Sequence, residues 1–215
     1  MTAILQAILD YGAQGLMTGF IVFLRVGAAM AMLPAFGEQS VPQRVRLVLA
    51  LAFTLVTAPA VAPDVAGLAA EGHVIGPWLV TETLIGLAIG MVLRLFILAL
   101  QIAGTIAAQS TSLSQFFGGA GVEPMPAISY LLTIGGLALA VMTGLHLKLV
   151  ELFIISYQML PAGQLPAASD MMNWGVGNTA YVFALAFALA APFVIASLIY
   201  NVALGVINKA MPQLM

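Results

Sequence analysis

Long apolar stretches alternate along the chain with short polar segments that are rich in proline and glycine. Because Pro and Gly interrupt regular structure, each apolar stretch predicts a helix bounded by them. The second stretch is closed by Pro59 and Pro63, and a polar hinge follows it over residues 63–77. The predicted helical blocks cover residues 14–33, 47–62, 78–117, 127–160 and 175–209.

The lengths of these blocks can be compared with the thickness of a lipid bilayer. A hydrocarbon core of ~30 Å needs ~20 helical residues. The third, fourth and fifth blocks are clearly longer than that, and Pro192 lies inside the fifth. We therefore expect these three to tilt, kink or project beyond the hydrocarbon, which a simple five-span bundle does not explain.

The composition also indicates a membrane protein. Of the 215 residues, 62% are hydrophobic and 7% are charged, and the mean hydropathy is +1.11. Soluble domains average roughly 45–50% apolar and about 25% charged residues. A water-soluble core of this composition would leave too little polar surface to cover it. We expect an all-α integral membrane protein, surrounded by membrane lipid, with one domain over residues 1–215.

The same counts exclude several classes of function. Six Lys and Arg against eight Asp and Glu leave a net charge of -2, so no basic patch is present to bind nucleic acid. Cysteine is absent and the two histidines, His73 and His146, lie far apart, so we expect no metal and no cofactor. No paired carboxylates or hydrolase motif are found, which predicts that the chain is not an enzyme.

The few basic residues orient the predicted spans. Arg44 and Arg46 follow the first block and Lys209 ends the fifth, whereas the segments with Asp64 and Asp170 contain no Lys or Arg. The positive-inside rule therefore predicts a cytoplasmic position for the three basic residues and an amino terminus outside. No Lys or Arg precedes Arg25, so a signal peptide is not expected and the first helix should be retained.

Polar side chains gather on one face of the third block. At 100° per residue they fall within about 120° of one another. Small and hydroxyl residues of this kind commonly form a helix-packing seam. Amides and an arginine are costly in hydrocarbon, so a face turned to water or polar partners is the second interpretation. The stripe comprises Gly90, Arg94, Gln101, Thr105, Gln109, Ser112 and Gln115.

A second stripe is predicted along the fourth block, which is taken as one helix. Within it, Lys148 and Glu151 stand at i,i+3 and can form a structural ion pair. The stripe comprises Ser129, Thr133, Gly136, Ala140, Gly144, Lys148, Glu151 and Gln158.

Arg25 and Glu82 are charges in the middle of apolar blocks. Each would cost ~3 kcal/mol near the bilayer centre if it were unpaired. They could pair with each other, or Glu82 with Arg94, and we favour partners from neighbouring helices or subunits.

The segment SLSQFFGGAGVEPMPAISY, residues 112–130, is the most unusual in the chain. Its glycines permit positive φ, and its prolines prevent a helix from restarting before Ala127. Phe116 and Phe117 lie beside the polar end of the third block. The segment is either an interhelical turn with two anchoring aromatics or a mobile hydrophobic plug, which closes a channel by excluding water.

Several segments together resemble the flagellar biosynthetic protein FliR family. The clearest is FLRVGAAMAMLPAFGEQSVPQRVRLVLALAFTLVTAP, residues 23–59. The resemblance continues in the same order over nearly the whole chain. The further segments are ETLIGLAIG (82–90), AGTIAAQ and the Gly-rich segment after it, MPAIS (125–129), GLHLKLVE (144–151), SYQMLPAG (156–163) and NVALGVINKAMPQL (201–214).

The resemblance implies the R subunit of a type III secretion export gate. In that family one R subunit joins five FliP-like and four FliQ-like subunits in a pore-forming complex of the bacterial inner membrane, at the flagellar basal body. An FlhB-like protein surrounds the cytoplasmic entrance, and unfolded flagellar proteins pass through the centre. The family's plug corresponds here to Ser114, Gln115, Phe116, Phe117, Gly118, Gly119 and Gly121, and its cytoplasmic entrance turn to Asn208, Lys209 and Pro212.

The resemblance also implies an internal division of the chain. Residues 1–126 correspond approximately to a FliP-like part, and residues 127–215 contain the start of a FliQ-like hairpin. The family normally continues past PQL into another helix, so the last helix of the hairpin is expected to be missing. The alternative function is a multi-pass permease for small molecules or ions. It would need inverted repeats around a midplane site, and no convincing repeat is found.

Overall fold

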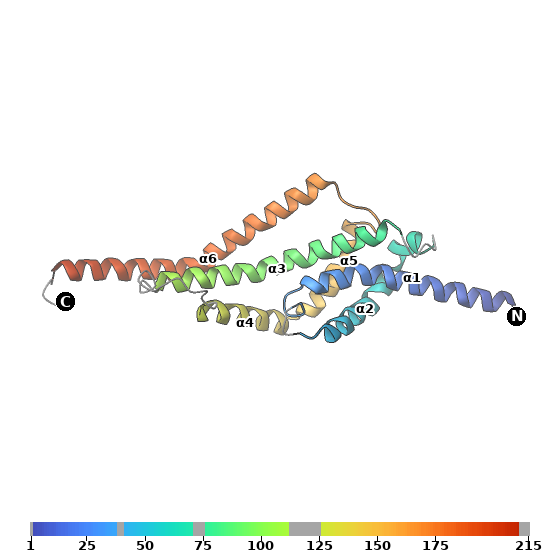
Figure 1. Ribbon diagram of the computed structural model, residues 1–215, viewed down its shortest axis with the longest axis horizontal. Coiled ribbons are helices and arrows are strands. Elements are labelled where there is room, and N and C mark those ends of the chain that lie inside the picture. Colours follow the sequence, from blue (N-terminus) through green and yellow to red (C-terminus); the bar gives the residue numbers. More distant parts are fainter. Residues whose placement is uncertain (1, 38–40, 71–75, 112–125, 211–215) are drawn as a thin grey trace. The chain divides into compact units, whose positions relative to one another are not determined.

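The computed structural model describes residues 2–37, 41–70, 76–111 and 126–210, and within these ranges it contains helices and no strand (Figure 1). The all-α fold expected from the sequence is confirmed. The helices are α1 (Thr2–Met32), α2 (Gln43–Ala70), α3 (Trp78–Thr111), α4 (Ala127–Met142), α5 (Leu145–Met159) and α6 (Ala168–Ala210).

Four of these helices are long and apolar enough to cross a membrane by themselves. The qualifying segments are Tyr11–Met32, Gln43–Ala70, Trp78–Ser110 and Ala168–Ile207. The pair formed by α4 and α5 passes the same test only as one bent span. The chain is therefore a membrane protein with four or five candidate spans within the described residues, and α3 and α6 are longer than one crossing requires.

The predicted second block was wrong at both ends. α2 begins at Gln43 and runs to Ala70, so Pro59 and Pro63 lie inside the helix and the expected hinge begins as helix. A proline inside a helix removes one backbone hydrogen bond. Here Val61, Val65 and Ala69 continue the buried face of α2 beyond the first proline. Burial of that face stabilises the helix beyond the two prolines, where the sequence alone predicts that the helix ends.

The predicted fourth block is two helices rather than one. The break lies at Gly144, whose φ of +87° is a left-handed conformation that glycine adopts at no steric cost. The second polar stripe, which assumed one continuous helix over residues 127–160, is therefore wrong as a single face. Two other helices begin earlier than expected, α1 at Thr2 and α6 at Ala168.

The chain divides into two compact units, and several helices contribute to both. Unit 1 contains residues 1–94 and 140–175, and unit 2 contains residues 95–139 and 176–215. The first unit therefore holds α1, α2, α5 and the beginnings of α3 and α6. The second holds the remainder of α3 and α6 and most of α4.

The core of unit 1 forms where α2 packs against α1 and α5. Apolar residues of α1 recur every three or four positions and are fully buried, among them Val22, Val26 and Ala29. Phe53 of α2 packs edge-on against Phe153 of α5, with 6.4 Å between ring centroids. The packing of α1, α2 and α5 in this core positions the residues of the site described below.

Unit 2 has a small core and a close contact between two helices. Ala99, Val182 and Ala186 form its cluster of buried apolar residues. A Cβ on Gly104 would collide with the backbone of Ser129, so the glycine permits α3 and α4 to approach closely. The Ser129 hydroxyl donates to the Gln101 carbonyl at 2.9 Å. Most large apolar side chains of α6 are exposed in the isolated chain.

Candidate functional site

A charged pair lies completely buried in unit 1. Arg25 of α1 donates from Nε to Glu82 Oε2 of α3 at 2.7 Å, and from Nη2 to Oε1 at 3.1 Å. Both side chains have no exposed surface. This two-bond geometry is the strong form of an arginine–carboxylate interaction. Gly86, one turn beyond Glu82, makes it possible, because a Cβ there would collide with the Arg25 carbonyl.

The guanidinium of Arg25 has three further contacts. Nη1 donates to the Ser156 hydroxyl at 3.2 Å, and Nη2 donates to the Leu160 carbonyl at 3.0 Å. The guanidinium carbon also lies 3.7 Å from the centroid of the Tyr157 ring, in a cation–π arrangement. Arg25 therefore ties α1 to the carboxyl end of α5 as well as to α3.

The Glu82 carboxylate extends this network to the segment after α5. Its Oε1 accepts a hydrogen bond from the Gly163 amide at 2.9 Å. Gly163 has φ +77° and packs against Leu68 of α2, so this turn is held on both sides. We call Arg25, Glu82, Ser156, Tyr157 and the backbone of residues 160–163 the Arg25 cluster. It fixes the path of the chain between α5 and α6.

The Arg25 cluster has a structural role. Its two charges neutralise each other, and the hydroxyl of Ser156 also donates to the Phe153 carbonyl at 2.7 Å. The Tyr157 hydroxyl is buried and makes no hydrogen bond to any described residue. No carboxylate or imidazole in the cluster is left open to act as an acid or base, so the arrangement holds helices together.

Sequence reasoning found only part of this cluster. It identified Arg25 and Glu82 as buried charges and kept Arg94 open as a partner of Glu82. In the structure Glu82 pairs with Arg25, while Arg94 is half-buried and makes no hydrogen bond or ion pair with the described residues. The roles of Ser156, Tyr157 and Gly163 were missed. Their signal was the SYQMLPAG segment, in which polar residues directly precede a Pro and Gly turn.

The surroundings of the polar stripe differ between the two ends of α3. At its start, Gly90 packs against α1, where a Cβ would lie 2.5 Å from the Ala29 carbonyl. That end is a packing seam. In unit 2, Gln101 and Thr105 are half-buried and border a shallow groove of about 290 Å³, and Gln109 is exposed. The polar density is therefore accessible only toward the carboxyl end of the helix.

Several candidate residues lie outside the described ranges. Ser112, the whole predicted plug from Ser114 to Gly121, and Pro212 belong to this group. Asn208 and Lys209 lie in the last turn of α6, and Lys209 is exposed there, where a positive charge favours the helix dipole.

The exposed pair of α5 differs from the Arg25 cluster. Lys148 Nζ lies 2.9 Å from Glu151 Oε2, and the two side chains are 76% and 56% exposed. Because both partners face the outside of the isolated chain, this pair adds little to the stability of unit 1.

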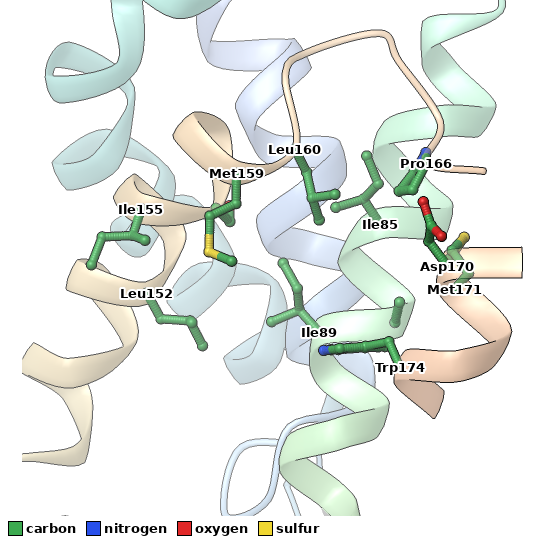
Figure 2. A pocket seen from close by; sticks show the side chains of 12 residues that line it. Ile85, Ile89, Leu152, Ile155, Met159, Leu160, Pro166, Asp170, Met171 and Trp174 are labelled. Carbon is green, nitrogen blue, oxygen red and sulfur yellow. The ribbon is translucent and has the colours of Figure 1, made fainter. Parts of the chain in front are cut away.

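A cavity of about 500 Å³ adjoins the Arg25 cluster in unit 1. Figure 2 shows its walls: Leu152 and Ile155 of α5 on one side, Ile85 and Ile89 of α3 in the middle, and Trp174 of α6 opposite. Asp170 contributes the one charged side chain among the lining residues. The cavity is otherwise almost entirely apolar, and Ser156 and Leu160 belong both to its wall and to the Arg25 cluster.

Comparison with known proteins places the sequence among export proteins. A family model described as bacterial export proteins, family 1, matches residues 16–215. Flagellar biosynthetic protein FliR of Caulobacter vibrioides is 35% identical over 194 residues, which cover 89% of this chain and 77% of the relative. FliR of Escherichia coli is 32% identical over 199 residues, covering 91% and 75%. FliR of Aquifex aeolicus is 27% identical over 203 residues, covering 93% and 77%.

Proposed function

The chain belongs to the bacterial export proteins, family 1, and on that basis we propose that it is the R subunit of a flagellar type III protein export gate. The match over residues 16–215 and the relatives named flagellar biosynthetic protein FliR carry this proposal. Its long apolar helices support a membrane position. We place the gate in the bacterial inner membrane at the flagellar basal body.

The proposed partners are five FliP-like and four FliQ-like subunits around one copy of this chain, with an FlhB-like protein at the cytoplasmic entrance. The exposed apolar surface of α6 supports an assembly of this kind. Tyr181, Phe183, Phe187 and Leu198 are among its exposed large residues in the isolated chain. Because α6 is longer than one bilayer crossing and exposes many apolar residues, its surface suits contact with other subunits as well as with lipid.

We propose the division into a FliP-like part, residues 1–126, and the start of a FliQ-like hairpin, residues 127–215, on the family resemblance. The Arg25 cluster supports a rigid first part, because its ion pair holds α1 against α3. Contacts from the same cluster to Leu160 and Gly163 extend this rigidity to the segment that precedes α6. A gate subunit needs rigid helices of this kind, because the proposed plug must move relative to a part of the protein that stays fixed.

The pore itself is proposed to run along the exposed end of the α3 stripe. Gln101, Thr105 and Gln109 supply polar groups that unfolded chains can pass without strong binding. Directly after this stripe, Phe116 and Phe117 are proposed to form the apolar part of the plug, and the glycines beside them allow it to move. With the plug in place the constriction excludes water and ions, and a passing substrate displaces it.

Secretion by cells tests the proposed function. A strain lacking its own R subunit is complemented with this chain, and rod, hook and filament proteins are measured in the medium together with swimming. We expect restored secretion of these proteins. A small-molecule or ion permease would leave secretion at the level of the null strain, and that result would contradict the export-gate function.

Replacing both Phe116 and Phe117 with glycine tests the plug separately. We expect the assembled gate to leak small solutes at rest, because the constriction loses its apolar groups. Uptake of a membrane-impermeant dye by resting cells measures the leak. The matched control replaces both residues with leucine, which retains the apolar seal. Unchanged dye uptake in cells that contain the assembled glycine variant would refute the plug assignment.

A further inference from the structure

The cavity beside the Arg25 cluster combines an apolar interior with one negative charge. Its interior is formed by side chains such as Ile89, Leu152 and Trp174. Ser156, the other polar lining residue, already donates to a backbone carbonyl and accepts from Arg25, so its bonds are made within the protein. Any occupant must therefore be mainly apolar, and among the described residues that line the cavity only Asp170 can interact with it by charge.

The charge around the cavity selects against an anionic occupant. No Lys or Arg lines it, and the sequence contains none between Lys148 and Lys209. The neighbouring cation, Arg25, is fully buried and bonded to Glu82. Asp170 is exposed in the first turn of α6, and its carboxylate accepts only a long 3.5 Å bond from Ser169 among the described residues. A positively charged group on the occupant would complement it.

The cavity lies near the beginnings of two helices that are long and apolar enough to cross a membrane. Ile89 lies eleven residues from the start of α3 at Trp78, which corresponds to ~16 Å along a helix, and Trp174 lies ~9 Å from the start of α6 at Ala168. Both α3 and α6 are candidate membrane spans. Tryptophan is enriched at such interfaces, where its ring is apolar and its N–H can meet polar groups.

The size of the cavity suits a thin, flexible occupant such as an acyl chain. At about 500 Å³ it lies within the ~300–1,000 Å³ range of ligand pockets. An acyl chain is narrow enough to follow the apolar wall between α3 and α5.

We propose that this cavity binds one phospholipid whose headgroup carries an ammonium group, such as phosphatidylethanolamine. An acyl chain lies between α3 and α5, against Ile89 and Leu152, and the ammonium group binds the carboxylate of Asp170. Lipid in this position fills the space beside the Arg25 cluster and supports the segment between α5 and α6.

Native mass spectrometry of the full chain tests this proposal. The chain is purified in detergent and offered equal amounts of palmitoyl-oleoyl phosphatidylethanolamine and palmitoyl-oleoyl phosphatidylglycerol. We expect a one-to-one adduct in which the ethanolamine lipid is retained about fivefold more than the glycerol lipid, the ratio that one charge-assisted bond at an exposed carboxylate supports. Asp170→Asn should bring the ratio close to one, and Asp170→Glu should preserve it.

Three further variants separate the site from general lipid adhesion. Ala88→Phe narrows the cavity from its wall and should abolish both adducts, whereas Ala138→Phe, on an exposed position of α4, should not. Asp64→Asn removes an exposed carboxylate outside the cavity and should leave the ratio unchanged. Equal retention of the two lipids, or an unchanged ratio in Asp170→Asn, would overturn the proposal. Loss of the adduct from the chain co-purified with its partner subunits would also overturn it, because a protein segment would then fill the cavity.

Discussion

Replacing Glu82 with leucine should lower the free energy of unfolding by about 3–5 kcal/mol, because it leaves the charge of Arg25 buried without a counter-charge. The change removes two hydrogen bonds from the guanidinium and one from the Gly163 amide. The remaining acceptors of Arg25, the Ser156 hydroxyl and the Leu160 carbonyl, are neutral. They cannot replace the lost carboxylate.

Replacing the other partner, Arg25→Leu, should cost a similar amount, because the Glu82 carboxylate then loses its counter-charge and keeps the hydrogen bond from the Gly163 amide. The double variant Arg25→Leu/Glu82→Leu leaves no buried charge and should be less destabilised than the sum of the two single changes. We expect a coupling energy of about 2–3 kcal/mol between the two positions.

Unfolding in dodecyl maltoside micelles with an increasing fraction of SDS, followed by far-ultraviolet circular dichroism, measures these differences. The matched control is the exposed pair of α5, where Lys148→Ala and Glu151→Ala should each change stability by less than about 1 kcal/mol. Additive effects of the two single leucine changes, or a cost below about 1 kcal/mol for Glu82→Leu, would refute the structural role assigned to the Arg25 cluster.

Three further predictions concern individual contacts. Tyr157→Phe should leave the free energy of unfolding unchanged or raise it in the same assay, since the hydroxyl is buried without a hydrogen bond to described residues. Tyr157→Leu should lower it by about 2 kcal/mol, because it removes the ring that contacts the Arg25 guanidinium. Equal changes in the free energy of unfolding for the two variants would contradict this. Gly90→Ala should lower the free energy of unfolding by about 1–3 kcal/mol, because the new Cβ collides with the Ala29 carbonyl. Gly19→Ala, which has open space around it, is the control and should raise it by up to about 1 kcal/mol. A Gly90→Ala variant as stable as the original chain would argue against the close approach of α1 and α3. Arg25→Leu should also reduce the yield of assembled export complex measured by co-purification, and a normal yield would show that its charge is not required for assembly.

The apolar blocks predicted where helices occur, because membrane helices are defined by composition over ~20 residues, but they did not predict where the helices begin and end. The errors arose where a local rule met a long-range contact. Proline normally ends or kinks a helix, yet Pro59 and Pro63 lie within α2 because the buried face of that helix continues past them. Gly144 was treated as one small residue on a stripe, although its positive φ ends one helix and starts the next.

The candidate site was predictable in its charges but not in its geometry. A buried Arg25 and Glu82 must be neutralised, so pairing could be anticipated from their cost alone. Their partners in the sequence could not, because Ser156 and Gly163 lie 131 and 81 residues away from the groups that they bind. Contacts at that separation depend on how the helices pack, which periodicity does not specify. The apolar cavity has no sequence signal either, since its lining residues come from three separate helices and from the segment between α5 and α6.

Native mass spectrometry of the detergent-extracted assembly tests the export-gate function most directly. The chain is expressed with its FliP-like and FliQ-like neighbours, isolated through a tag on this chain alone, and its mass is determined without crosslinking. The export-gate function predicts a large hetero-oligomer that contains one copy of this chain with five FliP-like and four FliQ-like subunits. A monomer or a simple homodimer, isolated from cells that contain all three proteins, would contradict it.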